Sequence, residues 1–326
     1  MMGIFLVILS ALTPQAKALL EKGIDASHVE DYTTASRTYV EAKKLCPSDP
    51  APYFLDGALT FIYMVDFVTD TLESRFDANL NKAERLAEAG IEENGDNARD
   101  LFFIGSVRIF RAVRYGWKKQ YTKALSAGMS ALNYLSKAVK LDPYLYDAYL
   151  ALGAYHYLWG IKGRYIPGMM SNKETINQGI REIKKVYDNG FYFTASAGQA
   201  YSWMMKKEGR ADEALEVSRE LVNAHPEART FRWGLGDLYI ELEMWGEAKK
   251  LFEGLLNDVL RDQPKCYTNH YQIKYKLAEI YHGLGYEDKA REYCQDVVDN
   301  KSKIRRDVGD ADFVKDAEKL LRKLGD

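Results

Sequence analysis

Cysteine is scarce in this chain, which holds only Cys46, Cys266 and Cys294 among 326 residues. Their odd number and wide spacing give neither a disulfide framework nor a metal-binding motif, although a Cys266–Cys294 disulfide stays an alternative for an exported protein. Proline is rare too, with 8 residues that stand mostly between the expected helices. Long runs that alternate between polar and apolar residues, which would indicate strands, do not appear. The sequence therefore favours an all-α fold.

No charge of one sign predominates. The chain has 45 basic and 47 acidic residues and a net charge of −2, so it creates no broad field to hold nucleic acid or an anionic membrane. We therefore expect no nucleic-acid partner. The 47% of hydrophobic and 28% of charged residues are typical of a folded protein.

Motifs of catalysis are also missing from the sequence. It contains no Gly-rich phosphate loop and no nucleophile elbow, and its histidines do not have the spacing of zinc ligands in His-Glu-x-x-His. We therefore expect a protein that is not an enzyme and that has no cofactor and no metal. The five histidines are His28, His156, His225, His270 and His282.

A continuous apolar run, Ile4–Leu9, lies near the amino terminus. After it, Ala16-Lys17-Ala18 places small residues at the −3 and −1 positions of a secretory cleavage site. We expect residues 1–18 to be a signal peptide and the protein to be periplasmic or secreted. The alternative is a retained apolar first helix, which would leave the protein in the cytoplasm. The run is shorter than the roughly 20 residues that span a bilayer, so no stable membrane span is expected, only a peripheral contact with the envelope.

One segment, Arg232–Phe252, carries the clearest pattern in the sequence. Leu235 and Tyr239 are four residues apart, so they share one face of a helix. Gly236 removes a side chain where a second helix must approach, and Ala248 does the same from the second helix. Phe252, one turn further on, would fill the space next to the following helix pair. The segment predicts two antiparallel helices.

The second-helix part of this pattern recurs along the chain. Small residues alternate with a larger one at helical spacing, and a proline often follows. Such a period of about 34 residues is the sign of stacked helix pairs. The copies are Ala35, Tyr39, Ala42 and Pro47; Ala131, Leu135, Ala138 and Pro143; Ala214, Ser218, Leu221 and Pro226; and Ala290, Cys294 and Val297.

Helix boundaries follow from capping residues and breakers. Asp49-Pro50 and Asp142-Pro143 each place a capping Asp before a Pro, which predicts a helix start. An inserted loop at 160–171 delays the next helix until near Asn172. We predict a right-handed α-solenoid of about seven helix pairs in residues 19–310, clearest at 195–298 and atypical at 51–190, with a polar capping helix in 311–326.

The pattern resembles the tetratricopeptide repeat (TPR) superfamily over nearly the whole chain after residue 18. Within it, Leu101–Ser106, Ala127–Pro143 and Asp147–Tyr157 are similar to exported bacterial TPR proteins related to the Iml2-like group. The resemblance implies a binding scaffold for a peptide or protein partner. It names neither the partner nor the oligomeric state.

In TPR proteins the first helices line a concave wall, so the resemblance also implies a partner-binding groove. Trp and Tyr offer large contact areas at low entropic cost, which suits capture of a peptide. The alternative for each aromatic residue is packing between repeats. The positions that match the wall are Tyr157, Trp203, Lys206, Trp233, Asp237, Glu241, Tyr275, Glu279 and His282.

One basic stripe is a second candidate site. Arg108, Arg111 and Arg114 recur every three residues and so share a helix face that could bind an anion. The alternative, which we favour, is a solvated helix end whose cations suit the C-terminal dipole.

The sequence thus leads to two functional hypotheses. The first is a protein-interaction scaffold that holds its partner in the concave groove. The alternative is a carrier that binds a small molecule or lipid in a pocket of the atypical early repeats. The loop at 160–171 is either a partner or membrane contact or folds back over the solenoid edge. Its apolar residues are Tyr165, Ile166, Pro167, Met169 and Met170.

Overall fold

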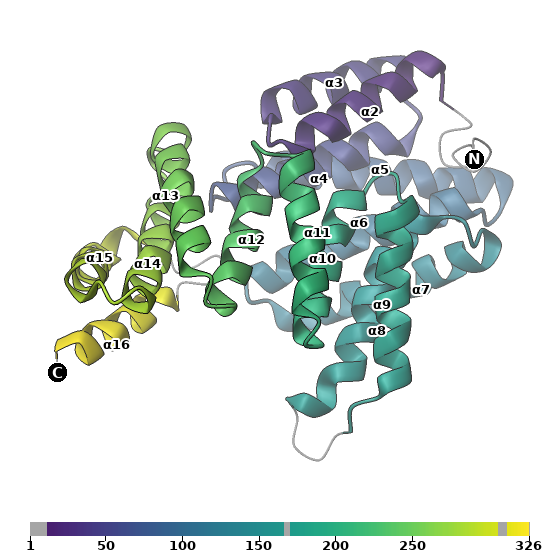
Figure 1. Ribbon diagram of the computed structural model, residues 1–326. Coiled ribbons are helices and arrows are strands. Elements are labelled where there is room, and N and C mark those ends of the chain that lie inside the picture. The colour runs from purple at the N-terminus through teal and green to yellow at the C-terminus, as the bar shows by residue number, and fades with distance from the viewer. Residues whose placement is uncertain (1–11, 166–169, 306–311, 326) are drawn as a thin grey trace. The chain divides into compact units, whose positions relative to one another are not determined.

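The computed structural model describes residues 12–165, 170–305 and 312–325 of the chain. Within these ranges the regular structure consists of fifteen α-helices and three short 3-10 helices (Figure 1). The chain forms two compact units. Unit 1 contains residues 1–62 and 72–217, and unit 2 contains residues 63–71 and 218–326.

The helices follow one another as seven pairs and a final single helix, which confirms the predicted all-α TPR-type fold. The bounds in the first five pairs are α2 Pro14–His28 and α3 Tyr32–Leu45; α4 Pro50–Asp66 and α5 Glu73–Asn94; α6 Ala98–Trp117 and α7 Tyr121–Leu141; α8 Tyr149–Ile161 and α9 Lys173–Asn189; and α10 Thr194–Lys207 and α11 Ala211–Ala224. The remaining elements are α12 Arg229–Glu241 and α13 Trp245–Asp262, α14 Tyr267–Gly283 and α15 Glu287–Asp299, and α16 Phe313–Gly325, with the 3-10 helices η1 Tyr146–Ala148, η2 Lys162–Arg164 and η3 Lys301–Lys303.

Small residues let the paired helices approach closely. A Cβ atom on Gly23 in α2 would lie 2.3 Å from the Tyr39 ring of α3, and one on Gly236 in α12 would lie 2.6 Å from the Phe252 ring of α13. The small and large residues of the recurring second-helix pattern are buried in all four copies. The predicted packing role of this pattern is therefore confirmed.

The backbones of α8 and α9 approach each other closely. A Cβ atom on Gly179 would lie 2.5 Å from the backbone nitrogen of Tyr157 and 2.6 Å from the carbonyl oxygen of Gly153. Two glycines thus bring the two backbones together, a contact that no larger residue permits.

Capping residues fix most of the predicted helix starts. Asp49 accepts a hydrogen bond from the Ala51 amide (2.8 Å) at the start of α4, and Asn172 accepts one from Thr175 (3.0 Å) at the start of α9. The helix start predicted at Asp142-Pro143 is wrong. Asp142 instead accepts from the Tyr144 amide in a turn (2.9 Å), and α8 begins only at Tyr149.

Unit 2 contains a short segment that comes early in the chain, residues 63–71. Arg229 binds the Asp66 carboxylate at 2.7 Å, and the Asn269 side chain donates to the Asp66 carbonyl at 2.6 Å. Arg305 donates to the Val68 carbonyl at 3.2 Å. Polar contacts from α12, α14 and the segment after η3 therefore hold residues 63–71 against unit 2.

The final helix, α16, covers the last pair of unit 2. Phe313, Val314 and Ala317 are buried in one cluster with residues of α14 and α15, including Tyr271 and Cys294. Its outer side carries the charged residues expected of a solvated end.

The predicted signal peptide falls largely on residues 1–11, which lie outside the described residues. Residues 14–18 form the first turn of α2, where Thr13 caps the helix and Ala16 is buried. Cleavage after Ala18 would therefore remove this first turn from α2.

Candidate binding site

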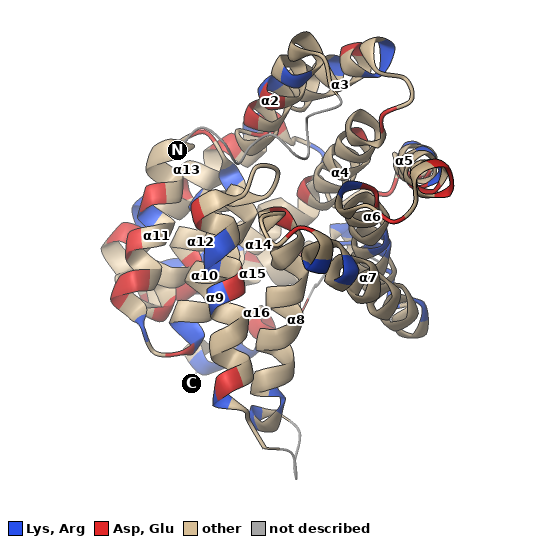
Figure 2. Cartoon of the chain, turned by 90° about the vertical axis from the view of Figure 1, so that its right-hand side faces the viewer, with Lys and Arg blue, Asp and Glu red and all other residues tan. Residues whose placement is uncertain are grey.

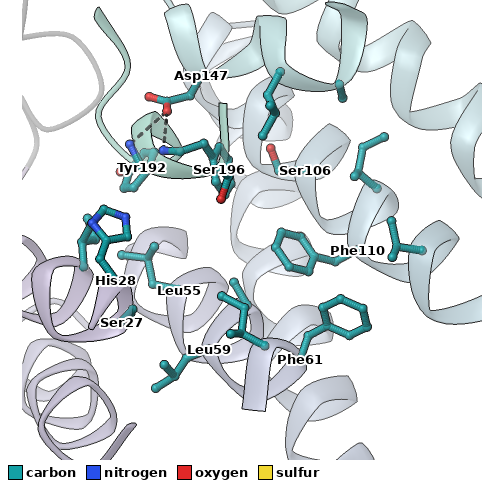
Figure 3. Close-up of a pocket in the computed structure, with 18 of the residues that line it drawn as sticks. Ser27, His28, Leu55, Leu59, Phe61, Ser106, Phe110, Asp147, Tyr192 and Ser196 are labelled. Carbon is teal, nitrogen blue, oxygen red and sulfur yellow. Dashed lines mark hydrogen bonds between the residues drawn. The ribbon is translucent and has the colours of Figure 1, made fainter. Parts of the chain in front are cut away.

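A cavity of about 370 Å³ opens on unit 1 (Figure 3). Its walls come from the first helices of five consecutive pairs, α2, α4, α6, α8 and α10, with smaller contributions from α3, α7 and η1. Its volume falls in the range of about 300 to 1,000 Å³ that small-molecule sites occupy. The cavity is therefore large enough for a ligand or for several side chains of a partner.

The lining is mostly apolar. Leu55, Leu59 and Phe61 come from α4, and Phe110 and Val113 come from α6. Figure 3 shows Asp147, Ser196 and Ser106 along one side of the cavity and Leu59 and Phe61 along the other. Among the described residues that line it, none is Lys or Arg. Because a charge buried without a partner is costly, the cavity suits an uncharged apolar group.

Asp147 is a buried carboxylate in this wall. Its oxygens accept hydrogen bonds from the amides of Phe191 (3.0 Å), Tyr192 (2.9 Å) and Phe193 (2.9 Å). Burial raises the pKa of Asp147 to about 6, although the three amide donors act to lower it. Asp147 therefore ties η1 to the turn before α10 and holds Tyr192 and Phe193 in the wall.

Aromatic rings form the layer behind the cavity. Phe54 is fully buried, and its ring lies 5.6 Å from both Phe103 and Phe110 and 6.2 Å from Phe193. The rings meet edge to face, the preferred arrangement of aromatic pairs. Because Phe110 and Phe193 also line the cavity, Phe54 supports both from behind.

The predicted groove residues of unit 1 lie outside this cavity lining. Tyr157 is fully buried and donates a hydrogen bond to Glu208 (2.7 Å), which Arg164 also contacts. Tyr157 is therefore a packing residue. Trp203 is 37% exposed and meets the Tyr157 ring edge to face at 5.6 Å, and Lys206 is partly exposed.

In unit 2 the structure brings three of the predicted groove residues together. Lys276 lies 3.1 Å from Asp237 and 3.8 Å from Glu279, and the Tyr275 hydroxyl donates a hydrogen bond to the Glu279 carboxylate. Burial raises the pKa of the Glu279 carboxyl, and the charge of Lys276 opposes that shift. The sequence reasoning missed Lys276, which partly neutralises the two carboxylates.

Two other residues predicted in unit 2, Trp233 and His282, contact residues outside this cluster. Trp233 packs edge to face on Phe252 at 5.8 Å. His282 contacts Glu287 at 2.9 Å, and Glu241 is exposed. A single groove that joins all the predicted residues therefore stays a prediction.

The arginine stripe is not open to an anion. The Arg108 guanidinium binds Glu84 of α5 at 3.0 Å, and Arg111 binds the other oxygen of the same carboxylate. Arg114 lies 3.4 Å from Glu73 and over the Trp117 ring. The stripe thus faces the carboxylates of α5 rather than solvent, so the structure corrects both interpretations of it.

The sequence hypothesis of a pocket in the early repeats named none of the residues that line this cavity, although a signal for them exists. The segments Ala51–Met64 and Leu101–Val107 are apolar around most of the helix circumference. A helix of that kind buries more than one face. The sequence could therefore have shown that α4 and α6 contact something besides their own pair, but not that they surround a cavity.

Two other kinds of site are absent from the described residues. In the described ranges, no group of three or more His, Cys, Asp or Glu side chains is placed to hold a metal ion. None of the helices in those ranges has the length and apolar character needed to cross a membrane.

Neither a protein-family model nor a curated protein sequence matches this chain. Solved TPR structures do match it. A signal-transduction ATPase with a TPR sensor from Pyrococcus horikoshii is 14% identical, with a TM-score of 0.51 over 97% of this chain and 47% of that one. A TPR protein from Parabacteroides merdae is 15% identical, with a TM-score of 0.41 over 96% and 100% of the two chains. YrrB, described as a TPR protein with an unusual peptide-binding site, is 18% identical, with a TM-score of 0.45 over 72% and 97%. At 14% identity, the likeness to the ATPase shows the fold alone, which is that of a TPR-type helical solenoid.

Proposed function

We propose that this protein is a non-enzymatic interaction scaffold that binds an apolar segment of a protein or peptide partner in the cavity of unit 1. One observation carries the proposal: the first helices of five consecutive pairs enclose an apolar cavity. The TPR resemblance also implies that the first helix of each pair contributes to the partner-binding wall.

The chemistry of the wall supports an apolar anchor on the partner. Ile62 and Val113 line the cavity and are 39% and 51% exposed, so a partner can reach them. Peptide grooves commonly bury a few aliphatic or aromatic side chains, which dominate the binding energy. In unit 1, Trp203 and Lys206 stay predicted partner contacts. In unit 2, Asp237, Tyr275 and Glu279 stay predicted groove residues.

Glutamate at the two exposed lining positions, Ile62 and Val113, should weaken partner binding. In Ile62→Glu/Val113→Glu, two charges would replace apolar contact surface and would lose their hydration on binding. We expect the affinity for the partner to fall about tenfold or more, which corresponds to 1.4 kcal/mol or more. The measurement is quantitative crosslinking and pull-down from native extract, with the crosslinked residues mapped by mass spectrometry.

The matched control is Val40→Glu/Leu45→Glu in α3. Both side chains are 42% exposed, and neither lines the cavity. This variant should retain the partner at the wild-type level. Undiminished capture by the folded Ile62→Glu/Val113→Glu protein would contradict the proposal.

A small-molecule or lipid carrier is the second candidate, because the volume and apolar lining of the cavity also suit a hydrocarbon ligand. Native mass spectrometry of the purified protein separates the two candidates. A bound small molecule that Ala154→Phe displaces would favour the carrier. The same substitution at Ala89, which is exposed on α5, is the control and should leave the ligand in place.

We further propose that the protein acts in the cell envelope and is related to exported bacterial TPR proteins of the Iml2-like group. The support is the apolar run at residues 4–9, the small residues before Leu19 and the similar segments named above. Amino-terminal sequencing of the mature protein should give Leu19 as the first residue. Retention of the run would contradict export by cleavage at this site.

A further inference from the structure

The cavity of unit 1 has a buried end and an exposed end. Along α6 it is lined by Ser106, Ile109, Phe110 and Val113, which share one helix face over about 10 Å. Ser106 is 5% exposed, whereas Val113 is 51% exposed. A group that enters beside Val113 would therefore meet Ser106 at the far end of this row.

Three polar residues of the lining lie on one side of the cavity. Figure 3 places Ser106, Asp147 and Ser196 on that side, opposite Leu59 and Phe61. The Asp147 carboxylate already accepts three backbone amide hydrogen bonds, and Ser196 is exposed. Ser106 is therefore the buried polar group on this side that an occupant of the cavity could bind.

The Ser106 hydroxyl has no hydrogen-bond partner in the part of the chain that the structure describes. A buried hydroxyl gains stability from a hydrogen bond, whatever molecule supplies it. The hydroxyl groups of two tyrosines in the wall cannot take the same role. That of Tyr39 is paired with Ser27 at 3.2 Å. The oxygen of Tyr192 also lacks a partner among the described residues, but it is buried, so an occupant cannot reach it.

Aromatic rings form much of the remaining wall. Phe61 and Phe110 meet edge to face, with their centroids 5.7 Å apart, and Phe110 and Phe193 are tilted by 35° at 6.4 Å. All three residues line the cavity. Rings in different orientations offer both faces and edges to another ring, which is the way aromatic groups prefer to pack.

The wall has little charge to offer an ionic group. None of the described residues that line it is Lys or Arg. Helix α8 contributes Leu150, Ala151 and Ala154 and carries no charged residue along its length, as Figure 2 shows. Because an unpaired charge is costly to bury, the wall favours an occupant that is aromatic, uncharged and able to form one hydrogen bond.

We propose that the cavity binds the side chain of a tyrosine in the partner, and that the phenol hydroxyl pairs with Ser106. This inference rests on the proposed function and names the anchor that the partner supplies. The ring would pack among Phe61, Phe110 and Phe193, with its hydroxyl at the far end. Partner serine and threonine carry the hydroxyl close to their own backbone, so they would not bring it to the buried end.

Ser106 would make the cavity select tyrosine over phenylalanine. A phenylalanine ring fits the same apolar walls but leaves the Ser106 hydroxyl unpaired and covers it. A site that forms a hydrogen bond with a ligand hydroxyl discriminates against the analogue that lacks it, because its own polar group then stays unpaired. The selectivity therefore depends on one hydroxyl group of the protein.

Two side-chain analogues test the selectivity, p-cresol for tyrosine and toluene for phenylalanine. Isothermal titration calorimetry measures the binding of each compound to the full chain. A phenol loses hydration when it enters an apolar cavity, so toluene would bind more tightly if Ser106 formed no hydrogen bond. We expect the opposite order, with p-cresol bound about tenfold more tightly than toluene.

Ser106→Ala should reverse this order, because only the phenol loses a hydrogen-bond partner. Its affinity for p-cresol should fall about tenfold, and its affinity for toluene should not fall. The matched control is Ser126→Ala in α7, since Ser126 is exposed and does not line the cavity. This control should keep the wild-type order, and both variants should keep the wild-type circular dichroism.

Photocrosslinking identifies the source of the phenol. With benzoylphenylalanine in place of the exposed Val113, irradiation in native extract should attach a protein segment that contains tyrosine, as mapped by mass spectrometry. An adduct with a free phenol, or with a segment that lacks tyrosine, would overturn the assignment to a partner tyrosine.

The calorimetry can overturn the inference without overturning the proposed function. Toluene bound as tightly as p-cresol by the wild-type protein, or an unchanged order in Ser106→Ala, would rule out selection by Ser106. No binding of either compound would overturn the inference as well. In each case, capture of the partner by Ile62→Glu/Val113→Glu decides separately whether the cavity binds a partner.

Discussion

Replacing Gly179 with alanine should destabilise unit 1 by about 3 kcal/mol or more, at the upper end of what overpacking costs. The added methyl group would lie 2.5 Å from the backbone nitrogen of Tyr157 and 2.6 Å from the carbonyl oxygen of Gly153. Backbone atoms cannot rotate away as a flexible side chain can. Relief therefore requires α8 and α9 to separate, which would also move the Leu150–Ala154 part of the cavity wall.

Chemical denaturation followed by circular dichroism measures this loss. Gly128→Ala in α7 is the matched control, since its Cβ atom would meet nothing nearer than 3.9 Å. In a helix interior alanine is better than glycine by up to about 1 kcal/mol, so the control should unfold at the same or a higher denaturant concentration. A Gly179→Ala protein as stable as wild type would show that α8 and α9 do not meet as described.

The second large effect is expected at Phe54. Truncation to alanine should cost about 3 to 5 kcal/mol, the usual range for a buried phenylalanine. The ring is fully buried and contacts Phe102, Phe103, Phe110 and Phe193, with centroids 5.6 to 6.4 Å apart. Its loss would leave a void directly behind the cavity wall, because Phe110 and Phe193 line the cavity.

Two measurements check the Phe54 prediction. Denaturant unfolding gives the stability loss, and Tyr121→Ala, at a side chain that is 69% exposed, should change stability by less than about 0.5 kcal/mol. A crystal structure of Phe54→Ala should show a larger cavity or rings shifted into it. If Phe54→Ala lost less stability than Tyr121→Ala, the Phe54 ring could not be packed among the four phenylalanines.

The helix pairs were predictable because they depend on local spacing. Gly236 faces the Phe252 ring, and Gly23 faces the Tyr39 ring, as the small and large residues of the pattern indicate. Asn172 starts α9 because its side chain can accept an amide hydrogen bond three residues on. In each case the partners lie in one helix or in the neighbouring helix, so spacing along the chain is enough to identify them.

The residues of the candidate site were not predictable by the same reasoning. Arg108 and Glu84 are in different helices, and nothing in the spacing of the arginines shows that Glu84 occupies their stripe. Tyr157 matches a wall position but is buried, because Glu208 and Arg164 close over its hydroxyl. Asp142-Pro143 has the composition of a helix start, yet α8 begins six residues later. Each outcome depends on a contact that the sequence pattern does not specify.

The sequence by itself determined that this protein is a series of paired helices with small residues at their crossings, because a repeated pattern fixes contacts between neighbours. Only the tertiary structure decided which surfaces are open. The cavity exists because side chains from α2, α4, α6, α8 and α10 leave space between them, and the arginine stripe of α6 is closed because Glu84 of the preceding pair binds it. Both depend on the angles between successive pairs, which arise from many packing contacts together and are not encoded at any single position.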